Sequence, residues 1–505
     1  MRYSRQLWFG LGLLSQLVTA VTPEVYNNGD CTSSRRFRGL AHTNALMRHS
    51  ADTFDAPRGV PLLALSAPNQ MSKIVGLGKR SPAVPAGVSV SVRANVEVGG
   101  QSGLQPCADD CDHPQPPPSE EPIVISGPGT LPRSDSYLTL DDARTGLLLD
   151  DEPFRPVGIN IYWLCNDENI EGRPKGYPTD KTRVREALAA AVAMGANTVR
   201  IGSCGTSLGF HDAIQPDLHH YADDDGMDIH DYAIWAAGRY DLKVILTLTD
   251  NYDYYHGGKY TILRWLGEPT DDAGARFFAD ERPIQVYLRY AKWVLGRVNR
   301  YNNIAYGEDP TVSIIETGNE LGAYMGKEGY PPLNWTDRVA QRIKQLAPLA
   351  LVMDGTDGIY NWSTKATAPG LLSPHIDIVT DHPYPRDINL FRTQAQLAKS
   401  ANKVFLLGEM NWLPTGATNA NLSDYLEVLD KYPSVGVLVW SLFTHDSQCS
   451  EYVLHNDSYS IYYPDGPNTP EEKQNIWSLV QWFYRVTDRA VPAVLPVQAC
   501  PQEVF

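Results

Sequence analysis

The sequence predicts a (β/α)8 barrel, because eight short apolar runs alternate with longer amphipathic stretches over roughly 350 residues. The count of eight favours a closed parallel barrel. A doubly wound sheet would need a glycine-rich phosphate loop after an early strand, and Val157-Gly158-Ile159-Asn160 does not provide one. The predicted strands are Phe154–Asn160, Thr198–Ile201, Lys243–Thr249, Val312–Thr317, Leu351–Asp354, Ile378–Asp381, Val404–Gly408 and Gly436–Trp440, and helices are predicted at Lys181–Met194, Pro283–Tyr301, Trp335–Leu346 and Glu471–Val486.

The beginning of the chain has the pattern of an export signal. Arg2 and Arg5 supply positive charge, Leu7–Val18 is largely apolar, and small residues end at Ala20. We therefore expect a signal peptide over residues 1–20 and a secreted, extracellular protein. No later stretch approaches about 18 uninterrupted apolar residues, so we expect no stable membrane association.

Residues 21–135 lack the pattern of a folded domain. Pro, Gly and Ser are frequent there, and Asp109–Pro122 is an acidic, proline-rich stretch that predicts a stiff linker. The character changes at Ser136, where Tyr137–Leu140 and Gly146–Leu149 predict a small hairpin before the barrel. We therefore predict a disordered N-terminal segment over 21–135 and a barrel domain over 136–505.

The charge balance limits the kinds of partner. With 43 basic and 59 acidic residues, the formal net charge is −16. Such a surface repels phosphate backbones, so nucleic acid is not expected as a partner, whereas neutral polymers remain open. We expect a monomer.

Seven cysteines fit an oxidising compartment, in which some of them should pair. Cys165 and Cys204 follow the first two predicted barrel strands, so we consider them a candidate pair. Four glycosylation sequons, at Asn334, Asn361, Asn421 and Asn456, are compatible with secretion.

Two carboxylates stand where apolar runs end. Glu320 follows Ile314–Asn319, and Glu409 follows Phe405–Gly408. The active sites of barrels gather at the carboxyl ends of the strands, so both side chains should face one site. Cleavage of a glycosidic bond needs two carboxyl groups, one that donates a proton and one that attacks or activates water. The pair therefore predicts a glycoside hydrolase.

Other polar and aromatic residues follow the predicted strands, and we expect them to contact substrate or orient the carboxyls. Arg200 and Tyr384 should lower the pKa of the attacking carboxylate, while Glu320 stays protonated in a less polar setting. Asn319 should hold a sugar hydroxyl. The full set is Asn160, Arg200, Asp250, Asn251, Asn319, Asp354, His382, Tyr384 and Trp440.

Residues 136–486 resemble glycoside hydrolase family 5, in which the acid/base and the nucleophile lie on barrel strands four and seven. The resemblance rests on Gly318-Asn319-Glu320, Leu407-Gly408-Glu409, Val199-Arg200-Ile201, His382-Pro383-Tyr384 and Trp440. It implies a retaining enzyme with Glu320 as acid/base and Glu409 as nucleophile, needing no cofactor and no metal. Trp440 would form the floor of the −1 sugar site.

Within that family the sequence is most similar to the endo-β-1,4-mannanases. The segment Phe154–Trp163 resembles their opening strand, and Ile304–Val312 resembles the approach to their acid/base strand. The resemblance implies a β-mannan polysaccharide as substrate and adds Trp163 to the expected substrate-binding residues.

The sequence departs from the mannanase pattern beside the acid. Leu321-Gly322 replaces the usual Pro-Arg, and the third loop, Asn251–Gly258, is rich in tyrosine instead of carrying the commoner tryptophan. A β-glucanase, an exo-acting β-mannosidase and a non-catalytic glycan-binding barrel therefore remain as alternatives. The aromatic residues that we expect as stacking platforms are Tyr252, Tyr254, Tyr255, Trp163 and Trp412.

A metal-dependent hydrolase is a further alternative, but it would need converging His and carboxylate ligands. Among the twelve histidines only His219 and His220 are adjacent. They lie in the acidic stretch Asp217–Asp228, which predicts solvated surface with at most weak affinity for calcium.

Overall fold

The structure, a computed structural model, describes residues 124–125, 135–202, 213–322, 329–414, 420–455 and 457–500. The chain divides into two compact units, Met1–Asp109 and Asp110–Phe505, and every described residue belongs to the second. The predicted signal peptide and almost all of the predicted N-terminal segment therefore lie outside the described residues. Among the residues that are described, no helix is long and apolar enough to cross a membrane.

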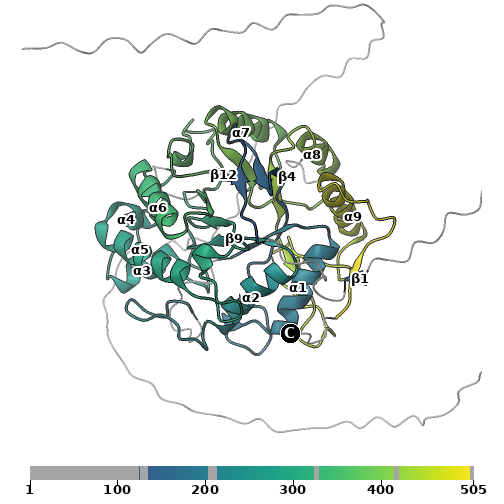
Figure 1. Ribbon diagram of the computed structural model, residues 1–505, viewed down its shortest axis with the longest axis horizontal. Helices are drawn as coiled ribbons and strands as arrows, with labels where there is room; N and C mark the ends of the chain where they lie inside the picture. The colour runs from purple at the N-terminus through teal and green to yellow at the C-terminus, as the bar shows by residue number, and fades with distance from the viewer. Residues whose placement is uncertain are drawn as a thin grey trace, which may run out of the picture. The chain divides into compact units, whose positions relative to one another are not determined.

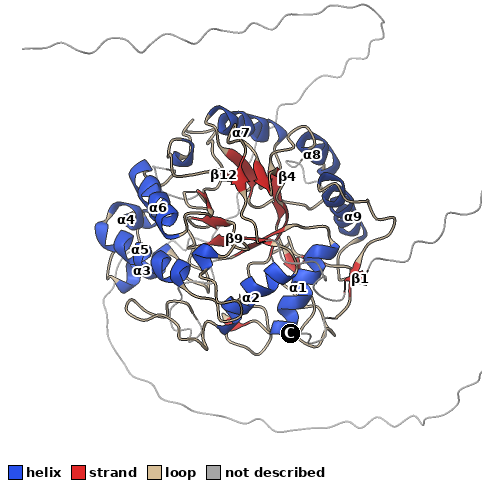
Figure 2. Cartoon of the chain, viewed as in Figure 1, coloured by secondary structure: helices blue, strands red, loops and turns tan. Residues whose placement is uncertain are grey.

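Eight parallel strands close into a barrel, as the sequence predicts, and helices surround it (Figures 1 and 2). The order of strands around the barrel is β10-β11-β12-β13-β14-β5-β8-β9. Because this sheet closes on itself, the doubly wound alternative is wrong. The strands are β5 (Val157–Asn160), β8 (Thr198–Ile201), β9 (Lys243–Thr247), β10 (Ile314–Glu316), β11 (Leu351–Met353), β12 (Ile378–Asp381), β13 (Val404–Leu407) and β14 (Gly436–Val439).

The first predicted strand is divided in two. Phe154 ends β4 (Glu152–Phe154), which pairs antiparallel with β3 (Leu147–Leu149), and β3 pairs with β2 (Thr139–Leu140). The barrel strand starts only at Val157, after Pro156, which has no N–H to donate. The amide of Asn197 bridges the break, because it accepts from the N–H of Val157 and donates to the carbonyl of Arg155, both at 2.9 Å. The predicted hairpin is thus a three-stranded sheet.

The helices lie between the strands in sequence, and several begin at a capping side chain. Asp180 caps α1, Asp387 caps α7, and Thr469 forms a reciprocal capping box with Glu472 at the start of α9. The predicted helix at 283–301 ends earlier, at Gly296, because Arg297 is extended. The helices are α1 (Lys181–Ala193), α2 (Asp228–Arg239), α3 (Lys259–Trp265), α4 (Arg276–Ala279), α5 (Glu281–Gly296), α6 (Leu333–Leu346), α7 (Ile388–Ser400), α8 (Leu422–Leu429) and α9 (Pro470–Val486).

Alternate residues of each barrel strand face opposite sides. Ile314, Ile378 and Leu406 fill the interior of the barrel, while their neighbours along each strand pack against the helices. Leu138 and Leu147 belong to the interior cluster, so the small sheet closes the amino-terminal end of the barrel. The opposite end, where the strands finish, is left for polar side chains.

Short elements complete the described part of the chain. One disulfide joins Cys449 to Cys500. Cys165 is buried, and its candidate partner Cys204 lies outside the described residues, so that pairing stays a prediction. The remaining elements are β1 (Val124–Ile125), β6 (Asn166–Asp167), β7 (Tyr177–Pro178), β15 (Leu442–Phe443), β16 (Ile461–Tyr462), β17 (Val497–Gln498) and short 3-10 turns at Asp272–Gly274, Tyr306–Glu308 and Pro369–Leu371.

Candidate active site

Glu320 and Glu409 both lie at the carboxyl end of the barrel. Glu409 comes two residues after β13, and Glu320 comes four residues after β10. Glu320 has a φ of 53°, in the left-handed region that few non-glycine residues adopt. Such a backbone conformation persists only where the surrounding structure holds it, and active sites are one place where it occurs.

Arg200, the last residue but one of β8, connects the two halves of this site. Its guanidinium donates to Oε1 of Glu409 at 2.9 Å and to Oδ1 of Asn319 at 2.7 Å. It also donates to both carboxyl oxygens of Glu316, at 2.8 and 3.1 Å, and to Asn160 at 2.9 Å. With five hydrogen bonds to four side chains, Arg200 is fixed in one orientation, pointing at Glu409.

His382, directly after β12, contacts both carboxyls. Its Nδ1 lies 2.7 Å from Oε1 of Glu320 and 3.5 Å from Oε1 of Glu409. The two oxygens therefore lie no more than 6.2 Å apart, the sum of these two contacts. Retaining glycosidases hold their carboxyls about 5–5.5 Å apart, whereas inverting ones need about 6.5–9.5 Å. The upper limit of this oxygen–oxygen distance lies below the spacing typical of inverting enzymes.

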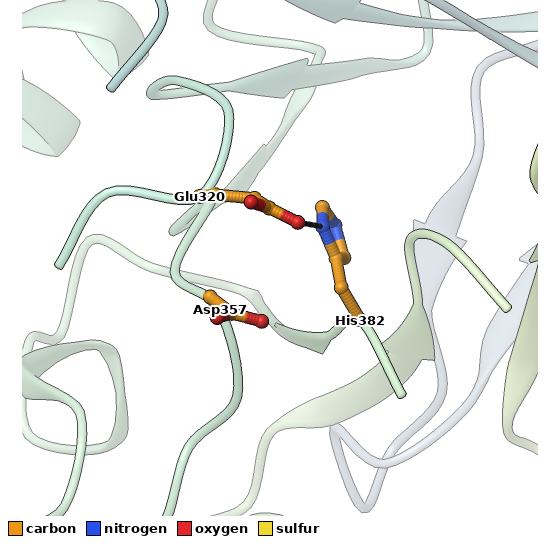
Figure 3. Close-up of side chains that lie close together, drawn as sticks. All are labelled: Glu320, Asp357 and His382. Atoms are coloured by element: carbon orange, nitrogen blue, oxygen red, sulfur yellow. Dashed lines mark hydrogen bonds and ion pairs between the residues drawn. The ribbon is translucent and has the colours of Figure 1, made fainter. Parts of the chain in front are cut away.

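Glu320 accepts a hydrogen bond on each of its carboxyl oxygens. His382 holds Oε1, and the phenol of Tyr252 donates to Oε2 at 2.5 Å. Figure 3 shows the carboxyl of Glu320 pointing at the imidazole of His382, with Asp357 beside them. Asp357 comes from the loop after β11, and one ligand atom from each of these three residues lies within 4.8 Å of the others.

The pKa of Glu320 is opposite to the direction that we expected from the sequence. Burial alone would raise it, but the hydrogen bond from His382, its positive charge and the phenol of Tyr252 outweigh burial and lower the pKa of Glu320. Burial also lowers the pKa of His382, but the charges of Glu409 and Glu320 raise it to about 9. The proton between Glu320 and His382 is therefore on the imidazole of His382 in the substrate-free protein.

The pKa of Glu409 is likewise opposite to expectation. Burial raises it, and the negative charge of Glu320 raises it further, while His382, Arg200 and the phenol of Tyr384 act in the lowering direction; the net shift is upward. Tyr384 donates to Oε2 of Glu409 at 3.1 Å. Arg200 and Tyr384 thus favour ionisation as predicted, but burial and the charge of Glu320 outweigh them.

Asn319 is oriented from two sides, so that its amide faces the site. Its carbonyl oxygen accepts from Arg200, and its Nδ2 donates to Oδ2 of Asp250 at 3.2 Å. Asp250 is in turn 3.0 Å from Nε2 of His256. One of the two amide hydrogens of Asn319 is used in the bond to Asp250, and the other is the candidate donor for the predicted contact with a sugar hydroxyl.

Trp440, directly after β14, is partly exposed, as a sugar platform must be. Its indole N–H donates to Asp457 at 2.8 Å, and the ring of Tyr162 stacks against it with centroids 5.3 Å apart. The position of the predicted platform is therefore fixed by a hydrogen bond at the indole nitrogen and by a stacked ring against one face.

Two residues that the sequence placed in contact with substrate are built into the protein instead. Trp163 is fully buried, donates its N–H to the carbonyl of Leu442 at 2.9 Å, and packs under the guanidinium of Arg183. Asn160 is 1% exposed; its oxygen accepts from Arg200 and its amide donates to the carbonyl of Gly408. Asn160 orients the site, and neither side chain is available to a sugar.

The other predicted stacking platforms also differ from one another. Trp412 is fully buried and donates to the carbonyl of Tyr459, so the prediction is wrong for this residue. Tyr255 is partly buried and donates to the carbonyl of Asn166. Tyr254 is 55% exposed, so of these three residues it is the most accessible to solvent.

Leu321 replaces the expected proline and makes a bond that proline cannot make. Its backbone N–H donates to the carbonyl of Gly355 at 2.9 Å, and its side chain is fully buried. Gly355 has a φ of 61°, and a Cβ there would lie 1.9 Å from the carbonyl oxygen of Gly318. The two loops around the acid are therefore joined backbone to backbone.

Several functional neighbours were missed from the sequence. Glu316 is a carboxylate inside the apolar strand β10, and this unusual position was the available signal. No local sequence pattern indicated that Asp357 would lie near the acid or that Tyr252 would donate a hydrogen bond to it. Asp354, which we had included, is buried and bonded to Thr356, and burial raises its pKa to about 7.

A metal centre is not indicated by the described residues. In the one compact His/carboxylate group among them, Glu320, Asp357 and His382, the imidazole Nδ1 faces Glu320 as a hydrogen-bond partner. In the acidic stretch, Asp217 pairs with His220 and Asp228 with Lys181.

Two carboxyl groups that face one site are the arrangement that hydrolysis of a glycosidic bond requires. In this site an arginine, a histidine and a tyrosine contact them. The family model described as GH family 5 beta-mannosidase-like matches residues 141–410, more than half of the chain. The chain belongs to glycoside hydrolase family 5.

Plant proteins are among the curated relatives. Mannan endo-1,4-beta-mannosidase 8 of Oryza sativa subsp. japonica is 30% identical over 227 residues, which cover 45% of this chain and 58% of the relative. Mannan endo-1,4-beta-mannosidase 7 of Arabidopsis thaliana is 27% identical over 253 residues, covering 47% and 56%. The chain thus spans a little over half the length of the curated relatives that it matches.

Solved structures confirm the fold. The endo-1,4-beta-mannanase from Rhizomucor miehei matches with a TM-score of 0.55 and 19% identity, covering 68% of this chain and 99% of that one. The endo-beta-1,4-mannanase from Thermotoga petrophila matches with a TM-score of 0.53 and 22% identity, covering 67% and 78%.

Proposed function

We propose that the protein is a secreted, retaining endo-β-1,4-mannanase that cleaves mannan, glucomannan or galactomannan by double displacement. The observation that carries the reaction type is the contact of one imidazole nitrogen of His382 with both carboxyls, at 2.7 and 3.5 Å. The limit that these two contacts set on the oxygen–oxygen distance supports the retaining arrangement over the wider inverting one. The mannan specificity rests on the plant relatives and on the family model.

In the first step Glu409 attacks the anomeric carbon while Glu320 gives a proton to the leaving oxygen. Arg200 and Tyr384 hold the two oxygens of Glu409, so that one lone pair is aimed at the sugar. His382 carries a proton below about pH 9 and is bonded to Glu320, so the pair can supply the acid with the proton that it donates.

In the second step Glu320 takes a proton from water, which attacks the glycosyl-enzyme and frees Glu409. Asn319 binds the sugar hydroxyl next to the anomeric carbon, and this hydrogen bond strengthens as positive charge develops on the ring. Trp440 supports the same sugar from below. No cofactor and no metal takes part.

Secretion, a monomeric state and an absence of stable membrane association belong to the same proposal. They rest on the predicted signal peptide, on the disulfide between Cys449 and Cys500, and on the acidic charge balance.

Release of reducing sugar from mannan, glucomannan and cellulose tests the substrate class. The wild type, Glu409→Gln and Glu320→Gln are compared, with Glu427→Gln as control, because Glu427 is exposed on α8. We expect mannooligosaccharides of mixed length from wild type and control, and at least a 1,000-fold loss in the other two. Release of mannose alone would indicate exo action, and cleavage of cellulose alone a glucanase.

The mechanism needs a second measurement. An aryl β-mannoside with a good leaving group needs no acid, so Glu320→Ala should still form the glycosyl-enzyme, and azide should release it as the β-azide. A product of inverted configuration would refute double displacement. Binding of mannan without any cleavage by the wild type would identify a glycan-binding barrel.

A further inference from the structure

Tyr252 contacts the proposed acid from a loop whose two ends are joined by a backbone hydrogen bond. It follows β9, and its own N–H donates to Oδ1 of Asp250 at 2.7 Å. The loop closes where the N–H of Lys259 donates to the carbonyl of Asp250 at 3.0 Å. A Cβ at Gly258 would lie 2.5 Å from that carbonyl oxygen, so only glycine allows this closure.

Lys259 then locks the loop to its surroundings. Its ammonium is fully buried and donates to Oδ1 of Asn251 and to the carbonyl of Ala273, both at 2.6 Å. The phenol of Tyr252 is therefore presented from a rigid backbone, with the ring of Tyr254 packed against it at 5.1 Å between centroids. A rigid donor can fix the geometry of its acceptor.

The acceptor is one oxygen of Glu320, and the other oxygen is already used. His382 holds Oε1 at 2.7 Å and Tyr252 holds Oε2 at 2.5 Å, so the plane of the carboxyl is determined. A carboxyl that accepts on both oxygens is stabilised in its ionised form, because a protonated oxygen would meet a donor.

Charged groups act on Glu320 from four other strands of the barrel or the loops after them. His382 after β12 and Arg200 on β8 favour its ionised form, while Glu409 after β13 and Asp357 after β11 oppose it. Burial and the charge of Glu320 raise the pKa of Asp357 well above its usual value. The hydrogen bond from Tyr252 is one of the interactions that favour the ionised form, so its removal should shift the ionisation of Glu320.

On the basis of the proposed function, we infer that Tyr252 is a positioning residue for the acid/base: its phenol fixes Oε2 of Glu320 and favours the base form that the second step requires. The family that the sequence resembles more commonly carries a tryptophan in this loop, and an indole has no hydroxyl group to donate to the acid. The tyrosine-rich third loop thereby acquires a role in the reaction itself, in addition to any contact with sugar.

The ionisation midpoint of Glu320, measured by carbon-13 NMR of labelled glutamate carboxyls, tests this without substrate. Glu320→Gln identifies its resonance. In Tyr252→Phe we expect the midpoint to rise by about 1–2 pH units, the equivalent of one hydrogen bond to a charged group. Tyr254→Phe, which changes the exposed neighbour in the same loop, should leave it within about 0.3 unit.

The pH profile of kcat/KM gives the second readout. The limb that follows Glu320 should move to higher pH in Tyr252→Phe by the shift seen in NMR, which a purely structural role would not produce. Tyr252→Trp keeps the bulk of the ring, and we expect it to raise the midpoint as well. An unchanged midpoint in both folded variants overturns the inference. If the protein cleaves no mannan, the proposed function fails, while the NMR result still decides the role of Tyr252.

Discussion

Glu316 supplies the charge that keeps Arg200 in place, and Glu316→Gln tests this. The carboxylate is fully buried and accepts from Nε and Nη2 of Arg200 and from the hydroxyl of Thr247. Glutamine keeps the shape but removes the charge and turns one acceptor into a donor that faces the guanidinium. Breaking a buried ion pair from one side costs about 3–5 kcal/mol. Because Arg200 retains Glu409, we expect the lower value, about 3 kcal/mol.

The melting temperature converts this value into a measurement. A domain of 370 residues (136–505) has an unfolding entropy of about 0.8 kcal/mol/K, so about 3 kcal/mol lowers the melting temperature by about 4 °C. Activity should fall by about 100-fold, since a guanidinium displaced by about 1 Å misplaces Glu409 and Asn319.

Calorimetry and mannan hydrolysis on the same preparations separate the two effects. Glu427→Gln, the same change on the exposed face of α8, is the matched control and should alter neither quantity. Equal melting temperature and equal activity in Glu316→Gln and wild type would refute the view that Glu316 balances Arg200.

Three further predictions follow from the same contacts. Tyr384→Phe removes a hydrogen bond to ionised Glu409, so the pKa of Glu409 should rise and the low-pH limb of kcat/KM should move to higher pH. We also expect kcat to fall by about 10- to 100-fold. A low-pH limb at the wild-type position would contradict this prediction. Leu321→Pro introduces the residue that is commoner in the family but removes the backbone hydrogen bond to Gly355. Denaturant unfolding should show a decrease of about 1–3 kcal/mol in the free energy of unfolding. An increase in stability would show that this hydrogen bond is dispensable. The pKa of His382 is raised to about 9, so its contribution to stability is complete below about pH 6.5 and is lost as the pH rises through 9. The urea midpoint of the wild type should therefore fall over that pH range. An equally steep fall in His382→Asn would assign the effect to another group.

The local pattern was enough to predict the barrel. Each strand is a short apolar run with polar residues after it, and the helices between them have an apolar stripe, so period and length identified all eight strands. The boundaries were less well predicted where a single residue changes the backbone. Pro156 divides the first strand, and the extended conformation of Arg297 ends α5 early.

The sequence by itself also determined which carboxylates meet, since parallel strands of a barrel end on the same rim and Glu320 and Glu409 each follow a strand. Only the tertiary structure decided the protonation of the two carboxyl groups and the residues that form hydrogen bonds with them. The pKa of a buried group depends on distances of a few ångströms to groups far away in the chain, such as His382 and Tyr252 around Glu320. In the same way Asn160 and Trp163 follow or end the strand where the sequence predicts a site. Their polar atoms, however, already form hydrogen bonds with Arg200 and with the carbonyl of Leu442. Strand ends are a local property of the chain, whereas partners and protonation are set by packing between residues that no pattern in the sequence brings together.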